Sequence, residues 1–209
     1  MKESRLVPDM KFARLAADEQ IERAIQALEK NGIKTLLAAS GQEARQKLWE
    51  LIPPGAEVFT ATSTTLDELG LLPEIDRRYD SVRVKLARMD AKKDRREMVK
   101  MGAVPEYIVG SVHAVTETGS VIIGSATGSQ LAGYSASAHR VIWIVGAQKI
   151  VPTMEDGMKR LYDYCLPLED ARALRVYGVN SGVNKILIIN KETTPGRITA
   201  IIVKEKLGF

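Results

Sequence analysis

Hydrophobic and polar positions follow two different patterns along this chain. Near the amino terminus, between residues 10 and 30, apolar side chains recur every three or four positions, which predicts an amphipathic helix. Further along, short apolar runs rich in β-branched residues are bounded by glycine or proline, which is typical of strands. These runs cover residues 33–39, 57–60, 107–109, 112–115, 121–123, 141–145, 185–189 and 198–203.

The order of these patterns predicts an α/β fold. The run 33–39, a helical pattern over 42–51 and the run 57–60 form a β-α-β unit, which implies a parallel pair with a right-handed crossover. Two of the central runs lack clean alternation, as expected for a sheet covered on both faces. A helix opened by Pro152 is expected to end at 166–168, and the last two runs pair naturally as a hairpin. The prediction is a mostly parallel sheet with helices on both faces, ending in an antiparallel hairpin.

Composition narrows the class of protein without changing this architecture. The chain has 209 residues, of which 45% are hydrophobic and 27% charged, so a disordered chain is excluded. We expect a single domain over residues 1–209, with a helical segment 1–30 packed on it. The net charge of +4 comes from intermixed acids and bases, which argues against a nucleic-acid partner. The polar amino terminus and the absence of a long apolar stretch predict a cytoplasmic protein without membrane contact.

Cysteine and histidine usage restricts the chemistry. With Cys165 as its one cysteine, the chain cannot form an internal disulfide, an iron–sulfur cluster from its own ligands or a cysteine-based zinc site. His113 and His139 are its only histidines and are far apart in sequence, so no metal site is predicted. Flavin and nicotinamide motifs are also missing, and the cofactor is left unknown.

Candidate chemistry gathers in the central stretch 103–151. An acidic corner at 116–119, a loop of small residues at 124–130 and the segment 146–149 each adjoin a predicted strand. In open α/β sheets, ligands bind outside the carboxyl ends of the strands. This stretch is therefore the expected site.

Two residues of this stretch are candidate catalytic groups. Glu117 could act as a base with a raised pKa or as a nucleophile, since it lies among apolar residues. Its alternative role is a hairpin turn residue that faces water. His139 precedes a strand and could serve as an acid or base near neutral pH, or could be an ordinary surface residue. His113 lies in an apolar run, which favours a satisfied interior residue.

Eight residues are candidates for binding an anionic ligand. The loop 124–130 resembles a phosphate cradle, because glycine allows the backbone to approach an anion, although turn formation alone would explain it. The hydroxyl-rich segment 61–68 leads into a helix and could bind an anion or only cap that helix, with Thr64 or Thr65 as the N-cap. A lysine after the third central strand could neutralise the ligand, and an amide in the loop 180–184 could hydrogen-bond it. The candidates are Ser63, Thr64, Gly124, Thr127, Gly128, Ser129, Lys149 and Asn180.

The segment 83–102 carries a dense mixture of basic and acidic residues. This pattern predicts a solvated helix with ion pairs between neighbouring turns. A second interpretation is that Arg95 and Arg96 face an acidic ligand or partner.

Three segments together resemble the LUD-domain family, which includes the lactate-utilization protein C group. They are residues 62–70, residues 111–119, and residues 139–146 with 149–151. The resemblance implies a three-layer, Rossmann-like sheet of the type shared by glucosamine-phosphate deaminases, ribose-phosphate isomerases and CoA transferases. It also implies a subunit that binds a small anionic metabolite and supports oxidation of lactate to pyruvate, with iron–sulfur oxidoreductase subunits as partners.

Two other functions remain open at this stage. The corner 116–119 looks like the Ser-Glu-Asn-Gly corner that holds the catalytic glutamate of CoA transferases. A stand-alone CoA transferase-like or phosphometabolite enzyme using Glu117 is therefore the alternative. A homodimeric interaction module with a vestigial site is the third hypothesis, a homo-oligomer is a possible assembly, and whether the chain is an enzyme is left open.

Overall fold

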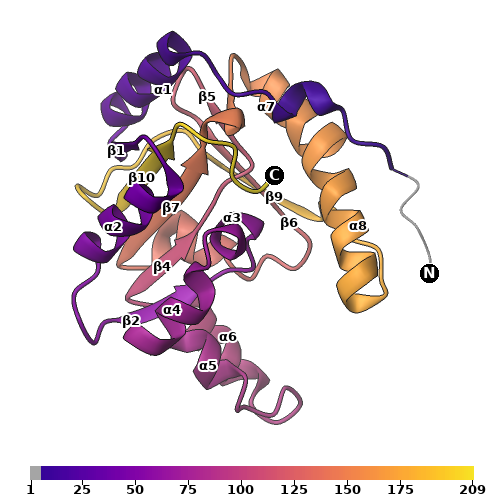
Figure 1. Cartoon of the computed structure of the whole chain (residues 1–209). Helices are drawn as coiled ribbons and strands as arrows, with labels where there is room; N and C mark the ends of the chain where they lie inside the picture. The colour runs from indigo at the N-terminus through magenta and orange to yellow at the C-terminus, as the bar shows by residue number, and fades with distance from the viewer. Residues whose placement is uncertain (1–5) are drawn as a thin grey trace.

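A six-stranded sheet forms the centre of the computed structural model, which describes residues 6–209. All of its neighbouring strands are parallel, in the order β1-β10-β7-β4-β2-β3. The strands are β1 (Lys34–Ala38), β2 (Glu57–Thr60), β3 (Asp80–Ser81), β4 (Tyr107–Gly110), β7 (Arg140–Gly146) and β10 (Ile198–Val203). Residues 1–5 of the expected amino-terminal helical segment lie outside the described part (Figure 1).

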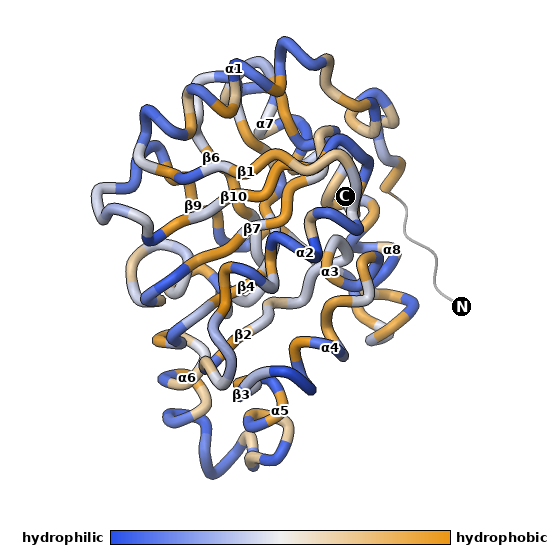
Figure 2. The backbone as a smooth tube through the Cα atoms, turned by 60° about the vertical axis from the view of Figure 1, so that its left-hand side comes forward, coloured by the Kyte–Doolittle hydropathy of each residue, from blue (hydrophilic) through white to orange (hydrophobic). Residues whose placement is uncertain are grey.

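Burial on both faces explains why β7 and β10 occupy the middle of this sheet. In β7, Trp143 and its alternate neighbours pack into one core, while Ile142 and Ile144 pack into the other. The second core is covered by α2 (Gly41–Leu51), α3 (Thr64–Glu68) and α4 (Leu71–Arg78). The apolar residues of β7 and β10 form a continuous hydrophobic centre of the tube in Figure 2.

The opposite face of the main sheet is covered by α1 (Asp18–Lys30) and by a second sheet. That sheet has the order β8-β5-β6-β9, and β5 and β6 form an antiparallel hairpin. Its strands are β5 (Ala114–Thr116), β6 (Val121–Ser125), β8 (Ile150–Val151) and β9 (Lys185–Ile189). Two short helices, α5 (Val82–Leu86) and α6 (Arg95–Ala103), replace the continuous charged helix expected over 83–102.

A long helix covers the outer face of the second sheet. It begins with α7 (Met154–Arg160), passes through a wide π-type turn at Leu161–Cys165 and continues as α8 (Leu166–Tyr177). The expected end at 166–168 is wrong, because Pro167 occupies the first turn of α8, where its missing N–H is tolerated. Gly178 ends the helix at φ 71°, a left-handed conformation that glycine adopts readily. None of the helices in residues 6–209 is long and apolar enough to span a bilayer.

The expected fold class is confirmed, whereas two strand pairings are wrong. β1 and β2 belong to the same parallel sheet but are separated by β10, β7 and β4. β9 does not pair with β10, because β10 is buried at every position and pairs with β1 and β7. β9 has exposed positions and instead extends the second sheet beside β6. The antiparallel hairpin of this fold is therefore β5–β6.

Candidate functional site

A cavity of about 450 Å³ lies at the carboxyl ends of the central strands. Residues 61–65 follow β2, residues 111–113 follow β4, and Lys149 follows β7, so three neighbouring segments line it from one side. The turn Leu161–Cys165 and α8 contribute residues from the other side (Figure 1). The site thus occupies the position where α/β sheets usually bind ligands.

Lys149 is the central charged group of this cavity. Its side chain is almost fully buried, and its Nζ donates hydrogen bonds to Thr65 Oγ1 at 2.9 Å and Ser111 Oγ at 3.0 Å. Both hydroxyls donate their own hydrogens to backbone carbonyls, Thr65 to Leu207 and Ser111 to Ile144. They can therefore only accept from Lys149, which fixes the direction of two of its N–H bonds.

No acid in residues 6–209 forms a salt bridge with this buried ammonium. Glu68 is near enough to raise the pKa of Lys149, but its Oε2 accepts the Gly208 amide at 2.6 Å. Burial, followed by the charge of Arg160, dominates and lowers the pKa of Lys149 to about 7. The lysine therefore changes its charge near neutral pH.

Arg160 is a second buried cation behind the cavity. Its Nε donates to the Gln148 carbonyl at 3.1 Å, and its Nη1 donates to the His113 carbonyl and to Cys165 Sγ. Its Nη2 has no hydrogen-bond partner among the described residues. Since guanidinium remains charged, Arg160 is a second buried cation that forms no salt bridge with an acid in residues 6–209.

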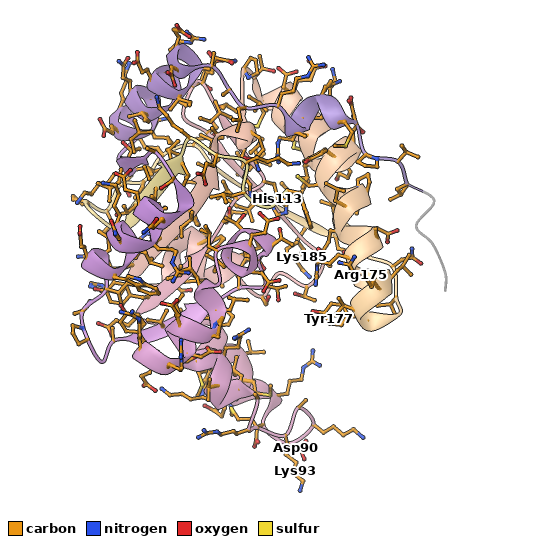
Figure 3. All side chains as sticks on the ribbon, viewed as in Figure 1. Asp90, Lys93, His113, Arg175, Tyr177 and Lys185 are labelled. Carbon is orange, nitrogen blue, oxygen red and sulfur yellow. The ribbon has the colours of Figure 1, made fainter. Side chains whose placement is uncertain are left out.

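His113 lines the same cavity as a neutral ring. Its Nδ1 accepts the Gly124 amide at 3.1 Å, so the single ring proton belongs on Nε2. Burial, together with the charges of Lys149 and Arg160, lowers its pKa to about 3. His113 can therefore donate one hydrogen bond to a ligand without adding charge. Figure 3 shows His113 in the interior, with Tyr177 and Arg175 toward the carboxyl-terminal end of α8.

The polar groups at the mouth of the cavity are largely committed to one another. The amide of Gly128 donates to Ser125 Oγ at 2.8 Å, so the small-residue loop satisfies part of its own backbone. Asn180 donates to both oxygens of Asp170, at 3.0 and 3.1 Å. Arg172 pairs with Glu169 at 2.6 Å. The free hydrogen-bonding capacity therefore lies deeper, around Lys149 and His113.

The structure gathers most of the expected ligand-binding residues at this cavity. Seven of the eight line it: Ser63, Thr64, Gly124, Thr127, Ser129, Lys149 and Asn180. Gly128 does not, because its φ of 86° turns the loop beside Lys185. The N-cap of α3 is Ser63, which accepts the Leu66 amide at 3.4 Å, so the expected cap at Thr64 or Thr65 is wrong by one or two residues.

The two expected catalytic residues lie away from the cavity. His139 precedes β7, at the amino end of the sheet, and is exposed, whereas the cavity lies at the carboxyl ends. Glu117 lies in the β5–β6 turn against α1, where it accepts hydrogen bonds from Arg23 at 2.6 Å and Gln20 at 2.8 Å. Arg23, and then Gln20 against an opposing effect of burial, lower the pKa of Glu117, the opposite of the raised value expected for a base.

We expect Glu117→Gln to lower the melting temperature slightly and to leave anion binding at the cavity unchanged. The amide can no longer pair with Arg23, but it keeps a hydrogen-bonding oxygen for Gln20. Because the pKa of Glu117 is lowered by folding, its stabilising contribution should fade as the pH falls below the usual range of a carboxylate. Scanning calorimetry and ligand titration check this, with Glu22→Gln on α1 as control. Loss of ligand binding at an unchanged melting temperature would instead support a role of Glu117 in the site.

Several residues of the site escape sequence analysis. Ser111 and Thr65, which hold Lys149, follow the carboxyl ends of β4 and β2, a position that could have singled them out. Arg160 lies on the same helical stripe as the buried Gly157, Leu161 and Tyr164, so a charge on an apolar face was its signal. Among residues 6–209, no group of three or more His, Cys, Asp and Glu is arranged to hold a metal ion.

The fold and the cavity define an α/β protein with a polar, cation-containing site at its strand ends. A profile of the LUD domain matches residues 21–203, which is most of the chain, and the chain belongs to this family. At the level of the family it is a lactate-utilization-type domain.

Solved structures share the fold of this chain. One of them is a DUF162 family protein from Deinococcus radiodurans, with a TM-score of 0.57 and 11% sequence identity over 91% of this chain and 99% of that one. At this identity the likeness concerns the architecture alone. No curated protein matches the sequence significantly.

Proposed function

We propose that the cavity binds a small anionic metabolite through Lys149. The observation that carries the proposal is a buried ammonium group that lines a cavity and has no salt bridge among the described residues. Burying a cation without a counter-ion is costly, and an anion of the right size would remove much of that cost. A bound carboxylate or phosphate oxygen would accept the third N–H of the ammonium.

The surroundings of Lys149 support a small and polar ligand. Arg160 adds positive potential from behind, and low dielectric strengthens its effect on an anion inside the cavity. His113 Nε2 and the hydroxyl of Thr64 belong to the lining and can supply neutral hydrogen bonds. About 450 Å³ is within the usual range for a small-molecule site.

Family membership supports lactate utilization as the setting of this binding. In this proposal the chain holds lactate, pyruvate or a related anion and supports the oxidation of lactate to pyruvate. Iron–sulfur oxidoreductase subunits would carry the electrons, because this chain has one cysteine and cannot supply the cluster ligands itself. Assembly of the chain into a homo-oligomer remains a prediction from the sequence.

The placement of Glu117 gives the alternative enzyme less support. A transferase nucleophile must reach the acyl group of the substrate, yet the carboxylate of Glu117 is held by Arg23 and Gln20 outside the cavity lining. We therefore favour the binding function at Lys149 over a CoA transferase-like reaction at Glu117.

A thermal-shift screen with lactate, pyruvate, inorganic phosphate and CoA tests the proposal. A ligand that binds only the folded state raises the melting temperature, and the shift grows with its concentration. We expect a shift with at least one of the small anions in the wild type and none in Lys149→Met. Equal shifts in both proteins would move the binding site elsewhere, and no shift with any anion would overturn the proposal.

A further inference from the structure

The hydrogen bonds of Lys149 leave one direction of its Nζ open. Thr65 and Ser111 can only accept, because their hydroxyl hydrogens go to the carbonyls of Leu207 and Ile144. They take two N–H bonds of Lys149, at 2.9 and 3.0 Å. The remaining position of the tetrahedral nitrogen has no partner among the described residues, and Lys149 lines the cavity. That position holds a third hydrogen in the ammonium form and a lone pair in the amine form.

The environment favours the amine form far more than it would at the surface. Lys149 is almost completely buried. The charged group with the largest effect on its pKa is another cation, Arg160. Desolvation and a neighbouring cation are the two means by which proteins turn a lysine into a nucleophile at neutral pH. With its pKa lowered to about 7, a substantial fraction of Lys149 carries the lone pair under physiological conditions.

We propose that Lys149 forms a covalent imine with a small carbonyl compound that bears an anionic group. The inference rests on the proposed anion site and assigns its ligand class. Nζ would attack the carbonyl carbon, and the carbonyl oxygen would leave as water with the two hydrogens of the amine. No electrons are gained or lost overall, so no oxidant or reductant is required. Protonation of the imine from solvent would restore a positive charge beside the anionic group.

Neighbouring groups suit both parts of such a ligand. The His113 ring is neutral, and its Nε2–H is the hydrogen-bond donor left over after Nδ1 accepts the Gly124 amide. Such a donor can polarise a carbonyl or stabilise the oxygen of the carbinolamine intermediate. The fixed charge of Arg160, which is hydrogen-bonded to the lining residues His113 and Cys165, attracts the anionic group into the cavity. A 2-oxo acid and a phosphorylated aldehyde both have this shared chemistry.

Borohydride trapping tests the inference directly. The full chain is incubated with pyruvate or with glycolaldehyde phosphate, reduced with borohydride, and analysed by intact mass and peptide mapping. We expect one reduced adduct per chain, on Lys149, with at least one of the two compounds. The compound that reacts then distinguishes a carboxylate from a phosphate ligand. Lactate, which has a carboxylate but no carbonyl, is the matched control and should give no adduct.

Two variants locate the adduct. Lys149→Arg cannot form an imine, so it should lose the adduct. Lys185→Arg, at the edge of the small-residue loop, should leave the adduct in place. Anion binding by the wild type without any adduct would overturn the imine and leave the proposed function standing. Labelling spread over surface lysines, or located at Lys185, would overturn it as well.

Discussion

Replacing Lys149 by methionine should make the protein more stable while abolishing its anion binding. A buried cation without an acidic partner is a cost to folding, and its replacement by an apolar side chain of similar length is expected to raise the free energy of unfolding by about 1–4 kcal/mol. Opposite effects on stability and binding are the usual sign of a residue retained for function.

The two hydroxyls that bind Lys149 should tolerate its removal. Ser111 keeps its hydrogen bond to the Ile144 carbonyl at 2.6 Å, and Thr65 keeps its bond to the Leu207 carbonyl at 3.3 Å. Neither hydroxyl is left without a partner, so the large penalty for a stranded buried polar group does not arise.

The difference in stability between wild type and Lys149→Met should depend on pH, in the direction set by the pKa shift of Lys149. The pKa of Lys149 is about 7 in the folded protein and 10.5 in a free lysine. Between these values the unfolded state binds the extra proton, so the stability of the wild type rises with pH across that interval. The full cost of burying the protonated lysine is present at and below about pH 7. The stability advantage of Lys149→Met is therefore largest there. Arg160, Glu68, Cys165 and His113 are the charged or titratable groups around Lys149.

Urea denaturation of both proteins at several pH values measures this effect. The gap between wild type and Lys149→Met should narrow steadily as the pH rises above neutrality. A methionine variant that is less stable than the wild type at neutral pH would show that Lys149 stabilises the fold, and would remove the argument for an anion site at Lys149.

Replacing Arg197 by alanine should have the largest destabilising effect, about 3–5 kcal/mol, because it breaks a buried ion pair. Arg197 and Glu192 are 6% and 8% exposed and lie 2.6 Å apart. The guanidinium also donates to the carbonyls of Tyr134 at 2.8 Å and Ser135 at 3.1 Å. It therefore ties the wide helical turn Gly133–Ser137 to the start of β10.

The unpaired charge of Glu192 accounts for much of the stability that Arg197→Ala loses. Burial alone would raise the pKa of Glu192, yet hydrogen bonds from the Thr194 amide and Arg197 hold it below its usual value. Without Arg197 the carboxylate would keep the Thr194 amide but lose the cation with which it pairs, Arg197 Nη2 at 2.6 Å. The double variant Arg197→Ala with Glu192→Ala should therefore be more stable than Arg197→Ala alone, which a double-mutant cycle measures.

Denaturant unfolding with a surface control completes this test. Lys159 forms an exposed i,i+4 pair with Glu155, and Lys159→Ala should barely move the urea midpoint. Tyr134, carried by the turn that Arg197 holds, lines the cavity, so Arg197→Ala should also weaken ligand binding. Equal losses for Arg197→Ala and Lys159→Ala would contradict the role given to the buried pair.

The positions of the strands can be predicted from the sequence more easily than the pairing between strands. The runs that form β7 and β10 can be recognised as strands because they are rich in β-branched residues, and both of their faces are buried. Which strands lie next to each other depends on contacts between distant segments, and the local apolar pattern does not specify them. Both β9 and β10 suit a hairpin locally, but β10 is buried at every position and lies inside the main sheet, between β1 and β7.

The sequence predicts where the candidate site lies in the fold, but it does not predict which residues contact one another there. Lys149 was singled out because it follows the carboxyl end of a strand, and it lies in the cavity. Its burial depends on Thr65, 84 residues earlier in the chain, and on Ser111, 38 residues earlier. Glu117 was singled out because its corner looked catalytic, yet Arg23, 94 residues earlier, binds its carboxylate. Local patterns carry no information about such distant partners.

Calorimetric titration of wild type and Lys149→Met with lactate and pyruvate tests the central claim most directly. We expect wild type to bind one anion per chain, more weakly as the pH rises through about 7 and the ammonium loses its proton, and the variant to show no binding. Binding of the same strength in both proteins, or binding that does not change across this pH range, would contradict a site built on Lys149.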